Sequence, residues 1–290
     1  MQAAGHLPAL TAGEKAARIG ILGASYPHEQ RAAEQIRCFF ALEGTGHMGM
    51  QDVYAQVERN IDRLVESNVG WSACATPAQL QKAREGKLEL LFGFDGAVPG
   101  DWLGDLRGKR VLCLAGAGGL QAPLMACAGA EVTVLDLSGR MLDLDREVAA
   151  RENLAIRLEH GNMCDLSRFA DASFDLVLNP PSLFYVPDVN PVFREVYRVL
   201  KKGGCFIMAS SNPIAYVCDW DGAAQCYKAV NRMPYSAQEH GEQGEWIEYG
   251  HTMESYLGGQ IAAGFVITGY REYQMEDITE LYFITKGEKR

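Results

Sequence analysis

The sequence lacks the cysteine spacing of a zinc site. Its eight cysteines are scattered along the chain, and no two of them form a Cys-x-x-Cys pair. Zinc-finger spacing is therefore absent, and we expect no metal site. Cys113, Cys127 and Cys205 lie inside apolar runs, where a free thiol behaves as a small hydrophobic side chain. Such usage is typical of a reducing compartment, so we expect a cytoplasmic protein.

Targeting and membrane segments are also missing. Residues 1–20 show no basic start followed by an apolar run, so no secretory signal is visible. Residues 111–130 carry no charge over a length that could cross a bilayer. They contain four glycines, Gln121 and Pro123, however, and strand-like EVTVLD follows directly. A buried strand, a tight turn and a buried helix explain this stretch better than a membrane span.

Basic patches are scarce in this sequence. The formal net charge is −10, and the longest basic cluster is Lys201-Lys202, at the expected end of a helix. An acidic surface repels phosphate backbones, so nucleic acid is not an expected partner. Apolar residues make up 48% and charged residues 22% of the 290 residues, a balance that favours an ordinary globular protein.

Strands and helices alternate from residue 109 onward. Short apolar runs predict strands, and longer segments with apolar residues at helical spacing predict the helices between them. This alternation is typical of a parallel sheet with helices on both faces. We therefore expect an α/β fold with a doubly wound, mostly parallel seven-stranded sheet. The predicted strands are 110–114, 132–135, 155–159, 174–178, 205–209, 265–270 and 280–285, and the predicted helices are 121–128, 138–151, 190–201 and 252–263.

The chain before this alternation predicts an N-terminal helical extension. We expect it to cap the molecule over residues 1–100, with the α/β domain over 101–290. An insert at about 211–251 is rich in tyrosine and tryptophan, which fits a lid over an organic substrate; the alternative is that these aromatics only pack the insert onto the sheet. The predicted N-terminal helices are 28–42, 52–67 and 77–86.

The strongest site signal is the glycine-rich stretch LCLAGAGGL at 112–120. It ends a strand and opens a helix, so its small residues let the backbone approach a ligand. Asp136 ends the next strand, where it can accept hydrogen bonds from ribose hydroxyls. The alternative is that the glycines only permit tight packing and that Asp136 caps the next helix. Gln121 stands where a dinucleotide GxGxxG needs glycine, which favours a nucleoside without phosphates and disfavours a nicotinamide-dependent oxidoreductase.

Several motifs, in order, resemble the class I S-adenosylmethionine-dependent methyltransferases. They are VLCLAGAGG at 111–119, VTVLD at 132–136, GNMCDL at 161–166, and FDLVLNPPS followed by FREVYRVLKKGG within 174–204. IAAGFVITGYREY and LYFIT resemble the last helix and antiparallel hairpin of that Rossmann-like fold. Over 71–290 the chain is similar to a bacterial, small-molecule-type branch of unassigned substrate. The resemblance implies S-adenosyl-L-methionine as the cofactor.

The resemblance also implies individual cofactor contacts. The turn at 115–119 would hold the methionine end, Asp136 the ribose, and Leu137 and Met141 the two sides of the adenine. The chain departs from the family at Cys113, where an acid is usual, at two alanines of the turn, and at Asn162, which replaces a more common Asp. The implied cofactor residues are Ala115, Gly116, Ala117, Gly119, Asp136, Leu137, Met141, Asn162, Met163 and Asn179.

The segment Asn179-Pro180-Pro181-Ser182 resembles the NPPY box of methyltransferases that act on exocyclic or amide nitrogens. In that box the last residue is an aromatic that stacks on the target, whereas this chain has Ser182. The following segment matches the small-molecule branch instead, so we do not expect nucleic-acid methylation. Pro180-Pro181 is equally explained as a pair that shapes the turn leaving the strand.

Candidate catalytic residues are His251 and Tyr185, which we expect to line the acceptor pocket. A methyltransferase aligns a nucleophile, excludes water and sometimes removes a proton, and a histidine accepts protons near neutral pH. His251 alternatively caps the helix that starts at Thr252. Asp188, a third base candidate, alternatively caps the helix that follows it.

We therefore expect an enzyme that methylates an O, N or S atom of a small-molecule acceptor, as a monomer or homodimer. The alternative is a non-catalytic nucleoside- or partner-binding module that retains the fold. Cys113, Ala115 and Ala117 keep this alternative open.

Overall fold

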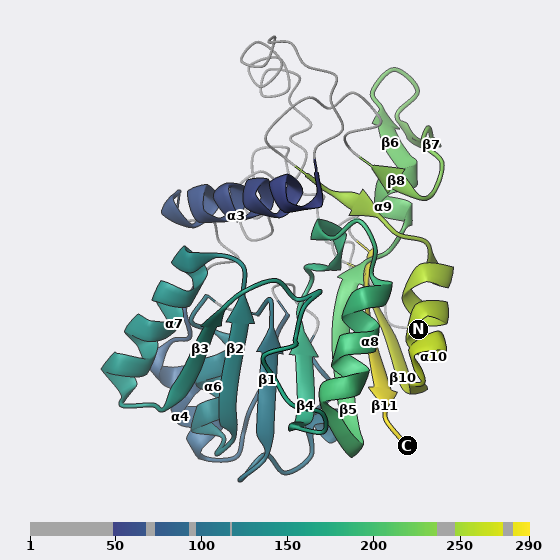
Figure 1. The fold of residues 1–290 in the computed structure, drawn as a ribbon. Helices are drawn as coiled ribbons and strands as arrows, with labels where there is room; N and C mark the ends of the chain where they lie inside the picture. The colour runs from purple at the N-terminus through teal and green to yellow at the C-terminus, as the bar shows by residue number, and fades with distance from the viewer. Residues whose placement is uncertain (1–48, 68–72, 93–96, 117, 237–246, 275–280) are drawn as a thin grey trace, which may run out of the picture.

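A seven-stranded sheet forms the centre of the structure (Figure 1), with strands in the order β10-β11-β5-β4-β1-β2-β3. β1 to β5 run parallel, and β11 is antiparallel to both β5 and β10. The predicted doubly wound, mostly parallel sheet is confirmed. The strands are β1 (Arg110–Leu114), β2 (Glu131–Asp136), β3 (Ile156–His160), β4 (Phe174–Asn179), β5 (Leu200–Ser211), β10 (Val266–Gln274) and β11 (Leu281–Glu288). This computed structural model describes residues 49–67, 73–92, 97–116, 118–236, 247–274 and 281–290.

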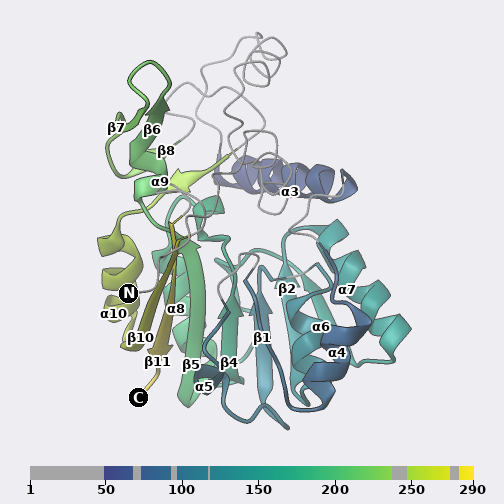
Figure 2. The same ribbon diagram turned by 180° about the vertical axis from the view of Figure 1, so that it is seen from behind.

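Helices cover both faces of the sheet (Figures 1 and 2): α4, α6 and α7 pack on one face, and α8 and α10 on the other. In β1, Val111 and Cys113 belong to one core cluster, whereas Leu112 and Leu114 belong to the other. Because successive side chains of a strand point to opposite faces, this unbroken apolar run requires cover on both sides. The helices are α4 (Pro77–Arg84), α5 (Gly100–Leu103), α6 (Gln121–Cys127), α7 (Gly139–Glu152), α8 (Asn190–Val199) and α10 (Gly259–Ala263).

The smaller elements lie at the end of the sheet where the parallel strands finish (Figure 1). Helix α3 lies there too, within the predicted extension. The predicted insert 211–251 contributes two small two-stranded antiparallel sheets, β6–β7 and β8–β9. The predicted helix 28–42 lies outside the described residues, as do residues 237–246 of the insert. The bounds are α3 (Met50–Glu66), η2 (Leu183–Tyr185), α9 (Ile214–Val217), β6 (Cys218–Asp221), β7 (Cys226–Ala229), β8 (Tyr235–Ser236) and β9 (Tyr249–Gly250).

Two predicted helices differ from the structure. The helix expected over 190–201 ends at Val199, because Leu200 is fully buried and pairs with Phe174 as the first residue of β5. Lys201 then forms an ion pair with Asp175 at 2.8 Å, so tertiary contacts end this helix before the glycines do. The helix expected over 252–263 begins as a π-helical turn, η3 (Glu254–Gly258), and continues as α10.

Helix α3 packs through an apolar face onto the elements at the strand ends. Val53 and Val57 are buried in one cluster with Ile247, which follows the part of the insert outside the described residues. Leu137 and Tyr185, from the loops after β2 and β4, pack against the same cluster. This contact joins the N-terminal extension, the insert and the edge of the sheet.

A second face of α3 carries three acids, Glu58, Asp62 and Glu66, spaced four residues apart and therefore on one side of the helix. Glu58 contacts the His160 ring at 2.9 Å, and Glu66 accepts from the Arg140 guanidinium at 3.1 Å. Asp62 accepts from the Ser138 hydroxyl and from the Arg140 backbone amide. Asp62 therefore places a negative charge at the N-terminus of α7, where the helix dipole favours it.

The turn between β1 and α6 requires glycine at two positions. Gly118 and Gly119 have φ values of +111° and +74°. A Cβ atom at Gly118 would lie 2.9 Å from Met141 Cε, and one at Gly119 would lie 2.8 Å from Cys74 Sγ. Ala115 also adopts a left-handed backbone, with φ +47°, which costs an L-residue about 1–2 kcal/mol. The turn is therefore tightly packed and strained at Ala115.

Replacing Ala115 with glycine tests this strain. Glycine reaches the left-handed region freely, but its greater freedom in the unfolded chain offsets about 0.4–1 kcal/mol of the gain. We expect Ala115→Gly to leave the free energy of unfolding unchanged or raise it by about 1 kcal/mol in urea denaturation. The matched control is Ala150→Gly, at an exposed position in α7, which should lose about 1 kcal/mol. Equal losses at both positions would contradict the strain at Ala115.

Removing the Asp62 carboxylate tests how α3 is fixed to α7. Asp62→Ala leaves the Ser138 hydroxyl and the Arg140 amide without this acceptor, so we expect a loss of about 1–2 kcal/mol in urea denaturation. Glu66→Ala removes only an exposed ion pair with Arg140 and should cost less than about 1 kcal/mol. If the two variants are equally stable, Asp62 does not anchor the helix.

Candidate cofactor site

The structure brings the predicted cofactor residues to one edge of the sheet, at the carboxyl ends of four adjacent strands. Ala115 and Gly116 follow β1, Asp136 is the last residue of β2, and Asn179 is the last residue of β4. Met141 lies in the first turn of α7, with its methyl group beside Gly118. Ala117 lies outside the described residues. Leu137 follows β2, and Asn162 and Met163 follow β3 after Gly161.

Asp136 is buried and held by its own loop. Its Oδ1 accepts from the Ser138 backbone amide at 2.9 Å. The N-cap of α7 is Ser138, whose hydroxyl accepts from the Met141 amide at 3.0 Å. The alternative that Asp136 itself caps this helix is therefore wrong. Instead, Asp136 fixes the chain that leaves β2, and its carboxylate stays at the end of the strand.

Asn179 carries a buried polar atom that the protein does not satisfy. Its Nδ2 donates to the Leu114 carbonyl and to the Ser182 hydroxyl, both at 2.8 Å. These two contacts fix the orientation of the amide, and Oδ1 has no hydrogen-bond partner in the described part of the chain. An unpaired buried acceptor costs about 1–3 kcal/mol. The end of β4 is therefore suited to a ligand that brings an N–H or O–H donor.

The Asn179-Pro180-Pro181-Ser182 segment forms a closed turn. Ser182 is buried, and its hydroxyl donates to the Pro180 carbonyl at 3.0 Å while it accepts from Asn179. Pro180 also lies 3.1 Å from the position of a Cβ at Gly116. The segment thus shapes the chain beside the β1 turn, and the side chain of Ser182 is used inside the turn.

Tyr54 of α3 reaches the segment after β3, a contact that sequence reasoning missed. Its hydroxyl lies 3.5 Å from Cys164 Sγ, and the Cys164 amide donates to Asn162 Oδ1 at 2.9 Å. Burial raises the pKa of the Tyr54 hydroxyl. The amphipathic pattern of residues 52–67 predicted the helix but could not tell which loop it would cover.

His251 is buried and its ring is oriented by backbone carbonyls. Nε2 lies 2.9 Å from the Val186 carbonyl and 3.2 Å from the Leu183 carbonyl. Because both partners only accept, Nε2 carries the hydrogen and Nδ1 is the basic nitrogen of the neutral ring. Burial lowers the pKa of His251 below its ordinary value of 6.5. Thr252, rather than His251, caps the following turn, since its hydroxyl accepts from the Ser255 amide at 3.0 Å.

Tyr185 lies in η2, the segment that His251 contacts, so the structure brings the two candidate catalytic residues to the same loop after β4. Burial raises the pKa of the Tyr185 hydroxyl well above its ordinary value of 10.0, which makes it a poor base. Asp188 is exposed and accepts from the Asn190 backbone amide at 2.9 Å. The N-cap of α8 is Val189, without a side-chain cap, so the alternative that Asp188 caps this helix is wrong; Asp188 instead fixes the chain just before α8.

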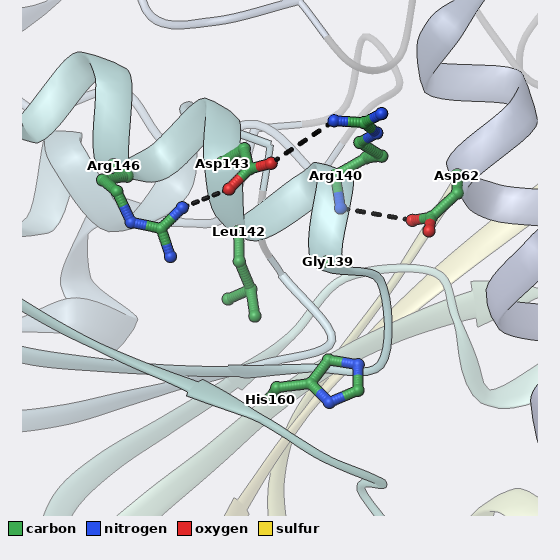
Figure 3. A pocket seen from close by; sticks show the side chains of 7 residues that line it. All are labelled: Asp62, Gly139, Arg140, Leu142, Asp143, Arg146 and His160. Atoms are coloured by element: carbon green, nitrogen blue, oxygen red, sulfur yellow. Dashed lines mark hydrogen bonds and ion pairs between the residues drawn. The ribbon is translucent and has the colours of Figure 1, made fainter.

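A surface pocket of about 470 Å³ lies beside this edge, on the first turns of α7 (Figure 3). Its charges are already compensated: Asp143 pairs with Arg140 and with Arg146, and Asp62 accepts from the Arg140 amide. None of the predicted cofactor residues lines it. The lining residues are Asp62, Gly139, Arg140, Leu142, Asp143, Arg146 and His160.

Metal and membrane features are absent from the part of the chain that the structure describes. Within it, no group of three or more His, Cys, Asp or Glu side chains is arranged to hold a metal ion. None of the described helices is long and apolar enough to span a bilayer.

Comparison with known proteins gives the family. Residues 112–208 match the family model described as a methyltransferase domain. The chain is 36% identical over 251 residues to the uncharacterized methyltransferase YbaJ of Bacillus subtilis. The aligned region covers 83% of this chain and 98% of that protein. A ubiquinone biosynthesis O-methyltransferase of Xanthomonas oryzae is 32% identical over 130 residues, or 44% of this chain and 54% of that protein.

A solved structure shares the fold. It is an S-adenosylmethionine dependent methyltransferase from Mesorhizobium loti, with a TM-score of 0.56 and 23% identity over 64% of this chain and 94% of that one. Three findings indicate the same family: the match over nearly the whole length of YbaJ, the methyltransferase domain from β1 to β5, and the strand order. The chain belongs to the class I S-adenosylmethionine-dependent methyltransferases.

Proposed function

We propose that this enzyme transfers a methyl group from S-adenosylmethionine to an O, N or S atom of a small-molecule acceptor, with both bound at the carboxyl ends of β4, β1, β2 and β3. The observation that carries the proposal is the convergence of the predicted cofactor residues at this edge, with the unpaired Asn179 Oδ1 among them. When bound, the cofactor supplies an electrophilic methyl group on its sulfonium.

Each part of the edge suits one part of the cofactor. The turn after β1 offers backbone amides to the methionine end, and Asp136 offers a carboxylate to the ribose hydroxyls. Leu137, Met141 and Met163 provide apolar surface for the adenine, and Asn162 offers an amide to its exocyclic amine. Asn179 Oδ1 accepts a hydrogen bond from the cofactor or from the acceptor beside it.

The acceptor binds between the end of β4 and the elements above it. Helix α3 and the insert 211–251 act as the cap and the lid, since Val57, Ile247 and Tyr185 pack in one apolar cluster there. Such a cluster excludes water from the reaction and suits an organic acceptor. The Xanthomonas oryzae relative is, by its name, a ubiquinone biosynthesis O-methyltransferase, which supports a small-molecule acceptor over a macromolecule.

His251 is the residue we assign to proton removal from the acceptor. Nε2 is held by the carbonyls of Val186 and Leu183, so Nδ1 is available to accept a proton. Tyr185 lines the same loop and orients the acceptor. We place the enzyme in the cytoplasm, because the cysteines of the described chain are free thiols, as expected in a reducing compartment. We propose that it acts as a monomer or homodimer.

Ligand binding tests the cofactor assignment. We expect S-adenosylhomocysteine, but not NAD, to raise the melting temperature. Asp136→Ala should weaken S-adenosylhomocysteine binding in calorimetry by about 1–3 kcal/mol, because the ribose hydroxyls lose their acceptor. The control Asp143→Ala alters the pocket of Figure 3 and should bind like the unmodified enzyme. Stabilisation by NAD would refute the assignment. So would weaker S-adenosylhomocysteine binding in Asp143→Ala together with unchanged binding in Asp136→Ala.

Transfer of a labelled methyl group into small molecules of a cell extract tests His251. We expect His251→Ala to lower the rate by about 10²–10⁴-fold with S-adenosylhomocysteine affinity unchanged. A base must be neutral, and burial keeps the pKa of His251 below 6.5, so the rate should fall only at pH values below 6.5.

A second variant separates the base from its structural role. His251→Gln keeps an N–H donor for the Val186 carbonyl but has no basic nitrogen, so it should fold normally and remain slow. Exposed His160, which pairs with Glu58, provides the control His160→Ala with a normal rate. Full activity in His251→Gln would show that His251 only orients the loop.

A further inference from the structure

Asp145 is a buried carboxyl group in the middle of α7 that the fold alone does not explain. Its side chain has no solvent exposure. Oδ1 accepts from the Gly119 backbone amide at 3.0 Å, whereas Oδ2 has no hydrogen-bond partner within the described residues. Burying a carboxyl group with one oxygen unpaired is costly, so its presence in the core points to a role at the turn it contacts.

Gly119 is held by hydrogen bonds at both its amide and its carbonyl, and Asp145 provides one of them. The Gly119 amide donates to Asp145, and the Gly119 carbonyl accepts from the Ala75 amide at 2.8 Å. Gly119 has φ +74°, so its peptide groups face these partners only in the left-handed conformation. Asp145 and Ala75 therefore hold the two peptide groups of Gly119 in the turn between β1 and α6.

Among the residues that the structure describes, no cationic side chain affects the titration of Asp145. Burial, together with the negative charge of Asp136, raises the pKa of Asp145 to about 7, against the opposing effect of hydrogen bonds from the amides of Gly119 and Gly118. The other titratable groups that face it are the thiols of Cys113 on β1 and Cys74 before α4. We therefore expect Asp145 to change its protonation state near neutral pH.

We propose that Asp145 is a positioning residue of the cofactor site, which holds the Gly118–Gly119 turn from α7 and supplies there the buried carboxyl group that β1 lacks at Cys113. This inference rests on the proposed function, in which the same turn holds the methionine end of the cofactor. Cys113 lies beneath the turn, with its Cβ 3.6 Å from the position of a Cβ at Gly116. A carboxyl group from either position can therefore face the turn.

The protonation state gives the role a measurable signature. Hydrogen bonds from backbone amides are stronger to an ionised than to a neutral carboxyl group, so the turn is held more firmly as Asp145 ionises. We expect the affinity for S-adenosylhomocysteine to rise between pH 6 and pH 8, on either side of the pKa of about 7. Asp145→Asn keeps an acceptor for Gly119 but cannot ionise, so its affinity should not follow this rise.

Stability should change with pH in the opposite sense. Because the folded-state pKa of Asp145 is raised from 3.8 to about 7, the folded protein binds more protons than the unfolded chain between these values. Its contribution to stability is therefore full below pH 3.8 and lost as the pH rises toward 7. In the absence of ligand, the urea midpoint of Asp145→Asn should exceed that of the unmodified protein at pH 8 by more than at pH 5.

The experiment measures S-adenosylhomocysteine binding by calorimetry and urea midpoints at several pH values. Asp145→Ala should weaken binding about tenfold or more, and adding Cys113→Asp to it should restore most of the affinity. The control is Asp143→Asn, two residues away on α7, whose carboxylate pairs with Arg146 at the surface; it should behave like the unmodified protein. Asp145→Asn has the shape of the native residue and carries the test if Asp145→Ala does not fold.

The possible failures are distinguishable. Unchanged affinity in folded Asp145→Ala, or stability profiles of Asp145→Asn that run parallel to the unmodified protein, would overturn the role of Asp145 while leaving the cofactor site intact. Loss of affinity in Asp145→Ala without rescue by Cys113→Asp would overturn the inference that the carboxyl group on α7 replaces one on β1. If the unmodified protein does not bind S-adenosylhomocysteine at any pH, the proposed function itself fails.

Discussion

The double burial of β1 determines much of the rest of the structure. This strand pairs in parallel with β2 and β4 and is covered by core clusters on both faces. The chain that leaves it therefore has to turn sharply toward α6, through left-handed residues at Ala115, Gly118 and Gly119. Since the neighbouring strands run in the same direction, the residues that end them, Asp136 and Asn179, arrive beside this turn. The strand pairing thus brings these residues to one edge of the sheet.

The chain has the methyltransferase fold despite departures from the family pattern in β1 and in the turn that follows it. Cys113 and Ala115 left open a protein that keeps the fold without activity, but the near full-length match to a methyltransferase places the chain among the enzymes. The structure shows how the turn is supported despite them. Its backbone is fixed by Asp145 and Ala75, and the acids of α3 contact α7 and the end of β3.

Sequence patterns predicted what depends on local periodicity. β1 lies where its apolar run predicted it, and Asp136 ends β2 as expected, because fully buried strands read as continuous apolar runs. Contacts between distant segments were not predictable in the same way. Asp145 lies among exposed charges such as Asp143 and Arg146 in the sequence, which gives no sign that it points inward. Likewise, the pattern of α3 showed an apolar face without showing that Tyr54 would cover the loop at Cys164.

We propose above all that the cofactor lies across the ends of β4, β1, β2 and β3. A crystal structure of the enzyme with S-adenosylhomocysteine tests it most directly. We expect density for the ligand over the turn after β1, with its ribose against the Asp136 carboxylate and a donor against Asn179 Oδ1. Density confined to the pocket on α7 that contains Asp143 and His160, with the strand ends free of ligand, would contradict it.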